Sequence, residues 1–145
     1  MGRPQDFDDM LRGGVAVKVY KPFNDGKYYD ERNRRVFPGD GFDWTALYQE
    51  MIGRIEKLES GPGSRVVIAR RFSDLAKARG AHKAAVILGN EGCLPLGREL
   101  EAFDALYQRG LREIALYWPA GRQTRHVLKE DRTLTPHAYQ IIERA

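Results

Sequence analysis

The sequence has 145 residues, of which 42% are hydrophobic and 30% charged, so it is long enough for one folded domain with a core. Its 24 basic and 20 acidic residues give a formal charge of +4 and a pI of about 9.3. Because both signs are mixed along the chain and no aromatic-rich basic motif accompanies them, nucleic-acid binding is not expected. Cys93 is the single cysteine, the N-terminus lacks the apolar run of a signal peptide, and no apolar stretch reaches bilayer length. The sequence therefore predicts a cytoplasmic protein with no membrane segment.

The first part of the chain contains two strand patterns and two helix patterns. A stretch rich in β-branched residues predicts the first strand, and apolar residues at helical spacing behind Asp43, a plausible N-cap, predict the long helix. Gly80 is expected to close the second helix. In chain order the predicted elements are a strand at 13–20, a helix at 43–58, a strand at 65–69 and a helix at 73–79.

The second part continues the alternation of strands and helices. Residues 84–89 form a continuous apolar run, which is typical of a strand covered on both faces in a parallel sheet. Three elements follow in order: a helix at about 97–108, a strand at 113–117 and a last helix that Thr135 caps. The helix at 97–108 is expected to point Leu100, Phe103, Leu106 and Tyr107 inward. Alternating strands and helices predict a single α/β domain over residues 1–145 with about four parallel strands. An open Rossmann-like sheet and a piece of a (β/α) barrel both fit this order.

Glu91 is the sharpest candidate for chemistry, because it comes directly after the apolar run at 84–89. The carboxyl ends of parallel strands are where ligands and catalytic groups gather in α/β folds. A solvated loop carboxylate is the alternative interpretation of the same position.

Several short motifs, in the right order, resemble those of the membrane dipeptidase family, also called renal dipeptidase. They are Arg12-Gly13-Gly14-Val15, Gly89-Asn90-Glu91-Gly92-Cys93, Gly110-Leu111-Arg112 and Leu134-Thr135-Pro136. The resemblance implies a partial TIM-like barrel, two zinc ions and hydrolysis of dipeptides. It also implies that Glu91 matches the family's metal-bridging glutamate, since one carboxylate has two oxygens and can hold two neighbouring cations.

The departures from the family pattern are equally specific. The family's His-x-Asp pair should precede Gly13, where residues 1–12 contain no histidine, and its later metal histidines and substrate arginine have no counterpart before Ala145. Trp118 stands where the family has a substrate-contacting histidine, and Cys93 replaces a glycine of the signature. Cys93 and His126 are possible additional zinc ligands, although a packing thiol and an exposed loop histidine are the alternatives.

The remaining candidates have plain structural alternatives. Tyr117 and Trp118 are candidates for lining a substrate pocket, or for packing the barrel rim. His82 and His137 are expected at the surface.

A four-strand piece of a barrel would expose two sheet edges and an apolar face, so we expect a second copy or another chain to complete the sheet. Two functions stay open: a truncated or divergent zinc dipeptidase with an incomplete metal site in this chain alone, and a non-catalytic α/β interaction module derived from that family.

Overall fold

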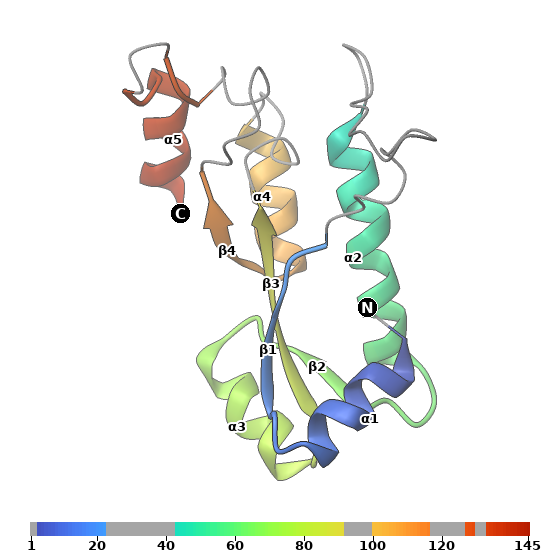
Figure 1. Ribbon diagram of the computed structural model, residues 1–145. Helices are drawn as coiled ribbons and strands as arrows, with labels where there is room; N and C mark the ends of the chain where they lie inside the picture. Colours follow the sequence, from blue (N-terminus) through green and yellow to red (C-terminus); the bar gives the residue numbers. More distant parts are fainter. Residues whose placement is uncertain (1–2, 23–42, 92–99, 117–126, 130–132) are drawn as a thin grey trace, which may run out of the picture.

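The computed structural model describes residues 3–22, 43–91, 100–116, 127–129 and 133–145. For Trp44 it describes the backbone but not the side chain. Five helices and four strands occur in this part of the chain, and they largely alternate (Figure 1). In order they are α1 (Pro4–Arg12), β1 (Val17–Tyr20), α2 (Trp44–Ser60), β2 (Val66–Ile68), α3 (Phe72–Gly80), β3 (Ala84–Glu91), α4 (Leu100–Arg109), β4 (Leu111–Ala115) and α5 (Pro136–Arg144). The predicted α/β class with four parallel strands is confirmed.

The strand β3 is the centre of the sheet, and every pairing within the sheet is parallel. β1 lies along one edge of β3, with Tyr20 opposite Leu88. β2 pairs with the first half of β3, and β4 with its second half, so β2 and β4 follow one another along the other edge. β1, β3 and β2 therefore form three adjacent strands along the first half of β3, whereas β4 continues the sheet along its carboxyl-terminal half.

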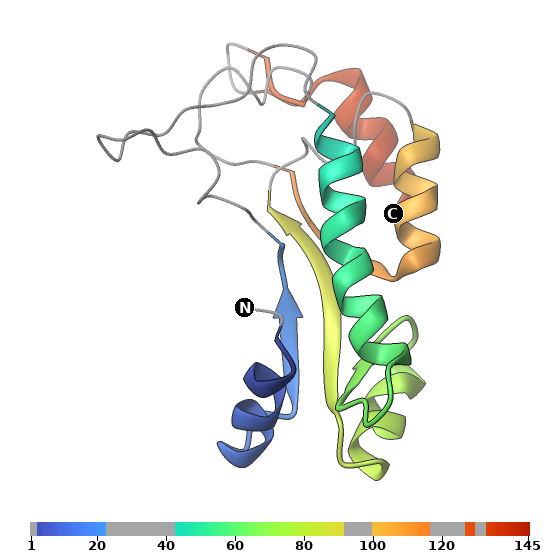
Figure 2. The same cartoon turned by 90° about the vertical axis from the view of Figure 1, so that its right-hand side faces the viewer.

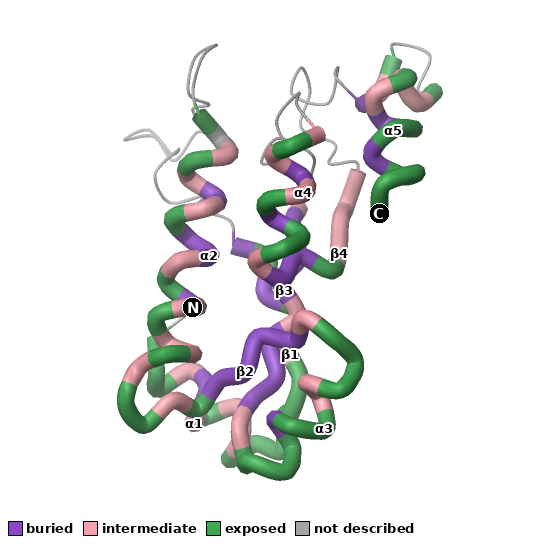
Figure 3. The backbone as a smooth tube through the Cα atoms, turned by 180° about the vertical axis from the view of Figure 1, so that it is seen from behind, coloured by how far each residue is buried: buried purple, intermediate pink, exposed green. Residues whose placement is uncertain are grey.

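The core lies between the sheet and the helices α2, α4 and α5, which run along one of its faces (Figure 2). From the sheet it takes the alternating side chains of Ala84, Val86 and Leu88, and the buried positions gather along β3 in Figure 3. From the helices it takes Tyr48, Ile52, Ile55, Phe103, Leu106 and Ile141, all at most 2% exposed. These helices thus show the one-sided apolar stripe expected from helical spacing.

The opposite face of the sheet is covered only in part by described residues. Near its amino-terminal end, Leu75 and Ala78 of α3 pack against Val67 and Ala85. On the same side of the sheet, Val17 and Val19 of β1 are each 45% exposed. We call the side that carries Val17, Val19, Ile87, Gly89, Glu91 and Glu113 the open face.

Two of the predicted helix starts are confirmed by their caps. The carboxylate of Asp43 accepts a hydrogen bond from the Ala46 amide at 2.8 Å, and the Thr135 hydroxyl accepts one from the Ala138 amide at 3.2 Å. Such caps satisfy amide groups that lack a partner within the helix.

Several boundaries differ from the prediction. The first helix was not predicted, and its end takes up Gly13 and Gly14, so β1 begins only at Val17. β3 continues to Glu91, which places this glutamate on the strand rather than in a loop. Gly80 is the last residue of α3, and the left-handed conformation after it falls on His82, with φ of 52°. The prediction that Tyr107 points inward is wrong, because it is 41% exposed beneath the guanidinium of Arg112.

Candidate functional site

Glu91 lies at the carboxyl end of the central strand, in register with Ala115 of β4. Because side chains alternate along a strand, Glu91 points to the same side as Gly89, which is the open face. Glu91 is partly exposed, whereas Asn90 beside it is fully buried among the helices. The carboxylate is therefore partly exposed at the end of the sheet where ligands bind in α/β folds.

The backbone next to Glu91 is held from inside the core by Tyr48. Its hydroxyl donates a hydrogen bond of 2.6 Å to the carbonyl oxygen of Gly89, and the side chain is only 2% exposed. Burial is the largest cause that raises the pKa of Tyr48 above its ordinary value, followed by the negative charge of Glu113. The hydroxyl thus stays protonated and remains a donor.

A β-bulge in β4 decides where Glu113 points. Leu88 pairs with Leu111, but Gly89 pairs with Glu113, so Arg112 is the extra residue. Leu111 is buried in the core, and the bulge turns Glu113, two residues later, to the opposite side of the sheet. The Arg112 side chain fixes this geometry by donating to the carbonyl oxygens of Arg70, Tyr107 and Leu111 at 2.7–2.9 Å.

The turn before the bulge requires glycine. Gly110 has a φ of 116°, and a Cβ there would lie 2.9 Å from Cγ2 of Ile68. The Gly110-Leu111-Arg112 motif therefore supplies, in order, a backbone conformation that favours glycine, a core side chain and the anchored extra residue of the bulge.

On the open face, Glu113 pairs with Lys21, the residue that follows β1. Nζ of Lys21 lies 3.0 Å from Oε1 of Glu113, and the two side chains are 36% and 34% exposed. The sequence analysis missed this pair, because 92 positions separate its members by their numbering and neither belongs to a motif. The one available signal was Gly89, since a glycine inside a strand often marks the close approach of another group.

Two groups of ionic hydrogen bonds hold α2 against its neighbours. Arg109 at the end of α4 makes paired hydrogen bonds of 2.7 and 2.9 Å to the Glu56 carboxylate, which lower the pKa of Glu56 and raise that of Arg109. Glu59 accepts hydrogen bonds from Arg70 and from the Ile68 amide. These contacts tie α2 to α4 and to β2.

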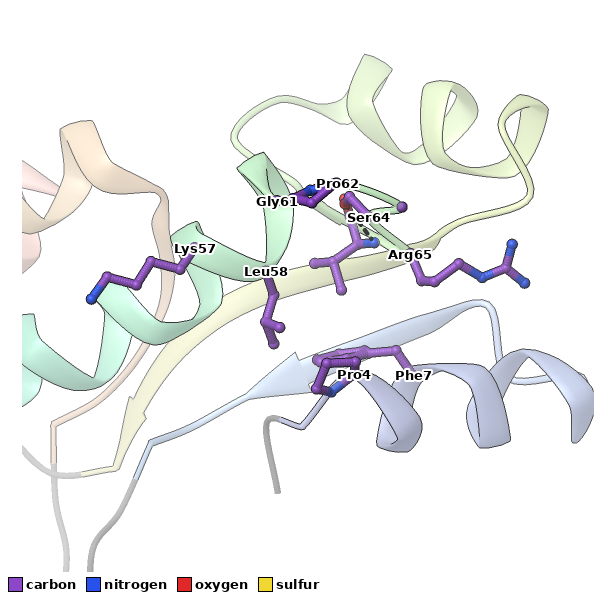
Figure 4. Close-up of a pocket in the computed structure, with 10 residues that line it drawn as sticks. Pro4, Phe7, Lys57, Leu58, Gly61, Pro62, Ser64 and Arg65 are labelled. Atoms are coloured by element: carbon purple, nitrogen blue, oxygen red, sulfur yellow. Dashed lines mark hydrogen bonds between the residues drawn. The ribbon is translucent and has the colours of Figure 1, made fainter.

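A small pocket lies at the other end of the sheet (Figure 4). It is formed by the start of α1, the end of α2 and the turn before β2, and the amine of Lys57 extends away from it. None of the described residues that line it is a histidine, aspartate or glutamate. None of its lining residues belongs to β3 either, so the pocket is separate from the region of Glu91.

Comparison with known proteins identifies the relatives of this chain. A sequence profile of the membrane dipeptidase family (peptidase family M19) matches residues 4–144. The chain belongs to the membrane dipeptidase family. The fold is also similar to that of a probable dipeptidase, PvdM, from Pseudomonas aeruginosa, with a TM-score of 0.71 and 18% sequence identity. That match covers 94% of this chain but only 36% of PvdM. No curated protein matches the sequence.

Membership of the membrane dipeptidase family raises the question of zinc. Within the described residues, no group of three or more histidines, cysteines, aspartates and glutamates lies close enough to hold a metal ion. A catalytic zinc site has about three protein ligands, so the described residues do not make one by themselves. Glu91, which the sequence analysis predicts to match the family's metal-bridging glutamate, lies at the carboxyl end of β3.

The other candidate residues of this dipeptidase-family chain have different outcomes. Cys93, His126, Tyr117 and Trp118 lie outside the described residues, so their roles stay predictions. His82 is exposed in the turn before β3, as expected, whereas His137 in the first turn of α5 is partly buried. No helix in the described part of the chain combines the length and apolar character needed to cross a bilayer.

Proposed function

We propose that this chain contributes to a zinc-dependent dipeptidase and that Glu91 is one of its metal ligands. The observation that supports the proposal is the position of Glu91, which lies at the carboxyl end of the central parallel strand, on the open face. In the sequence, the resemblance to the family implies that this residue matches the metal-bridging glutamate. A carboxylate there has two oxygens with which to hold metal, and bound zinc supplies an activated water and a polarised carbonyl in this type of hydrolase.

The remaining ligands are proposed to come from outside the described residues. Cys93 and His126 are the candidates, either from the same copy of the chain as Glu91 or from a second copy. In this proposal the chain holds one wall of the site, and dipeptides enter only after the rest of the barrel is in place.

The occupant of the open face is proposed to be a second copy of this chain. Val17 and Val19 of β1 are exposed on the open face. No described residue pairs with the outer edge of β1 or with the outer edge of β4. A two-fold symmetric dimer presents the same surface from both copies, so one exposed apolar face suffices for both partners. Size-exclusion chromatography with light scattering is expected to show a dimer, reduced to monomer by Val19→Lys. A stable monomer of the unmodified chain in dilute solution would refute self-association.

The metal proposal is tested by zinc content after dialysis, together with hydrolysis of a set of dipeptides. We expect stoichiometric zinc in the unmodified protein and its loss in Glu91→Gln. The matched control is Glu101→Gln, at an exposed position in the first turn of α4, which should keep the metal. A folded, metal-free protein after addition of zinc would contradict the proposal.

A non-catalytic interaction module is the second candidate, and one observation favours it: the described residues gather no three-ligand group. A zinc-free protein that still forms a stable dimer through the open face would support this function. We also propose a cytoplasmic location, because a single cysteine fits a reducing compartment; cell fractionation tests it.

A further inference from the structure

Three residues from three neighbouring strands meet on the open face, just before Glu91. Lys21 follows β1, Gly89 belongs to β3 and Glu113 to β4. The ion pair between Lys21 and Glu113, with an Nζ–Oε1 distance of 3.0 Å, therefore joins the two strands that flank β3. It passes over the central strand two residues before the signature glutamate.

The contact with Gly89 is close enough to exclude a side chain there. A Cβ at Gly89 would collide with Oε2 of Glu113, and it would lie 3.3 Å from Cβ of Glu113 and 3.2 Å from Cγ1 of Val19. Oε2 is itself buried and accepts no hydrogen bond from a described residue. The carboxylate thus lies directly on the backbone of β3, and this close approach explains the glycine in the strand.

The opposite side of the same residue is held as well. The Gly89 carbonyl oxygen accepts the hydroxyl of Tyr48 from the core side, at 2.6 Å. Gly89 is therefore held between a helix of the core and an ion pair on the open face. The bulge at Arg112 is what makes this possible, because it turns Glu113 away from the core.

We propose that Lys21, Gly89 and Glu113 form an inter-strand clamp that positions the end of β3, and with it Glu91. Lys21 and Glu113 are positioning residues that act through the backbone of Gly89. The importance of a well-positioned Glu91 rests on the proposed function, but the clamp itself does not involve metal.

The first test measures amide hydrogen exchange by NMR in the metal-free protein. Lys21→Ala and Glu113→Gln are expected to speed exchange at Asn90 and Glu91 about threefold, since a half-exposed ion pair contributes modestly. Exchange at Val86, in the first half of β3, should stay unchanged, which separates a local effect from general destabilisation. The control is Arg12→Ala, which removes an ion pair whose side chains are 76% and 70% exposed. Unchanged exchange at Asn90 and Glu91 in both clamp variants would overturn the proposal.

The second test is a double-mutant cycle between Gly89→Ala and Glu113→Ala. The clamp predicts that Gly89→Ala lowers the urea midpoint less in the Glu113→Ala background, because the colliding carboxylate is gone. Rescue will be partial, since Val19 and Cβ at position 113 stay near. If Gly89→Ala lowers the urea midpoint equally in both backgrounds, the explanation of Gly89 by its contact with the Glu113 carboxylate is overturned. If Gly89→Ala alone fails to fold, recovery of folded protein in the double variant supports the clamp, and failure of both refutes it. Neither test uses zinc, so failure of the clamp and failure of the metal proposal are distinguishable.

Discussion

Replacing Tyr48 with phenylalanine removes one oxygen atom from the interior next to the candidate site. The hydroxyl is the donor to the Gly89 carbonyl oxygen at 2.6 Å, and the ring is 2% exposed in the core. Because phenylalanine retains the ring, the buried apolar area stays nearly constant. The change therefore isolates the hydrogen bond between α2 and β3.

The expected loss follows from leaving the carbonyl without this donor. A buried polar group that loses its partner costs about 1–3 kcal/mol, and a carbonyl with a second lone pair falls toward the lower end. We expect Tyr48→Phe to reduce the free energy of unfolding by about 1.5 kcal/mol. With a urea dependence of about 2 kcal/mol per molar, the midpoint should fall by roughly 0.7 M.

Equilibrium urea unfolding followed by circular dichroism measures this change. The matched control is Tyr139→Phe on α5, where the side chain is 54% exposed, and its effect should stay within about 0.5 kcal/mol. Equal midpoints for the two variants, or a more stable Tyr48→Phe protein, would refute the view that this hydrogen bond holds the end of β3.

Three other changes test the surrounding framework by the same unfolding assay. Gly110→Ala should lower the free energy of unfolding by about 2–3 kcal/mol, because Gly110 has a φ of 116°. Gly53→Ala, in the interior of α2, should raise it by about 0.5 kcal/mol, because the added Cβ would lie 3.7 Å from the Arg109 guanidinium and meet no closer atom. A similar loss in both variants would contradict this contrast. Glu56→Gln should lose about 1 kcal/mol at neutral pH. Arg109 lowers the pKa of Glu56 in the folded state, so the difference in stability between the unmodified protein and Glu56→Gln should be largest above the unfolded-state pKa of about 4.3. The difference should vanish as the pH falls through the lower folded-state pKa. A difference that persists in strong acid would be inconsistent with an ionic origin. Asp43→Ala should lower the free energy of unfolding by about 1 kcal/mol, because it removes the N-cap of α2, whereas Asp43→Asn should retain most of the stability. Equal losses of stability in the two variants would argue against capping.

The parts of the fold that the sequence predicts are those with a strong local signal. The run at 84–89 is continuously apolar, which is typical of a buried strand, and it became β3. The apolar stripe behind Asp43 has helical periodicity, and it became α2. Short elements were harder to place. The helix α1 has mostly polar residues and one buried side chain, Phe7, so its sequence carries only a weak apolar pattern.

The candidate site was only partly predictable for a different physical reason. Glu91 was found because its position follows a strand and matches a short motif. The inter-strand clamp depends on a bulge at Arg112 that shifts the register of β4 by one residue and on contacts between strands far apart in sequence. A one-residue shift reverses which side of a sheet a residue faces, and periodicity alone does not reveal it.

The most direct test of the central claim is a crystal structure of the protein grown with zinc, with diffraction measured on both sides of the zinc absorption edge. If Glu91 is a metal ligand, an anomalous peak will lie at about 2.0–2.2 Å from one of its carboxylate oxygens, and the peak will be absent from crystals of Glu91→Gln. Ordered zinc elsewhere with an unliganded Glu91, or no zinc peak in a well-ordered assembly, would contradict the account.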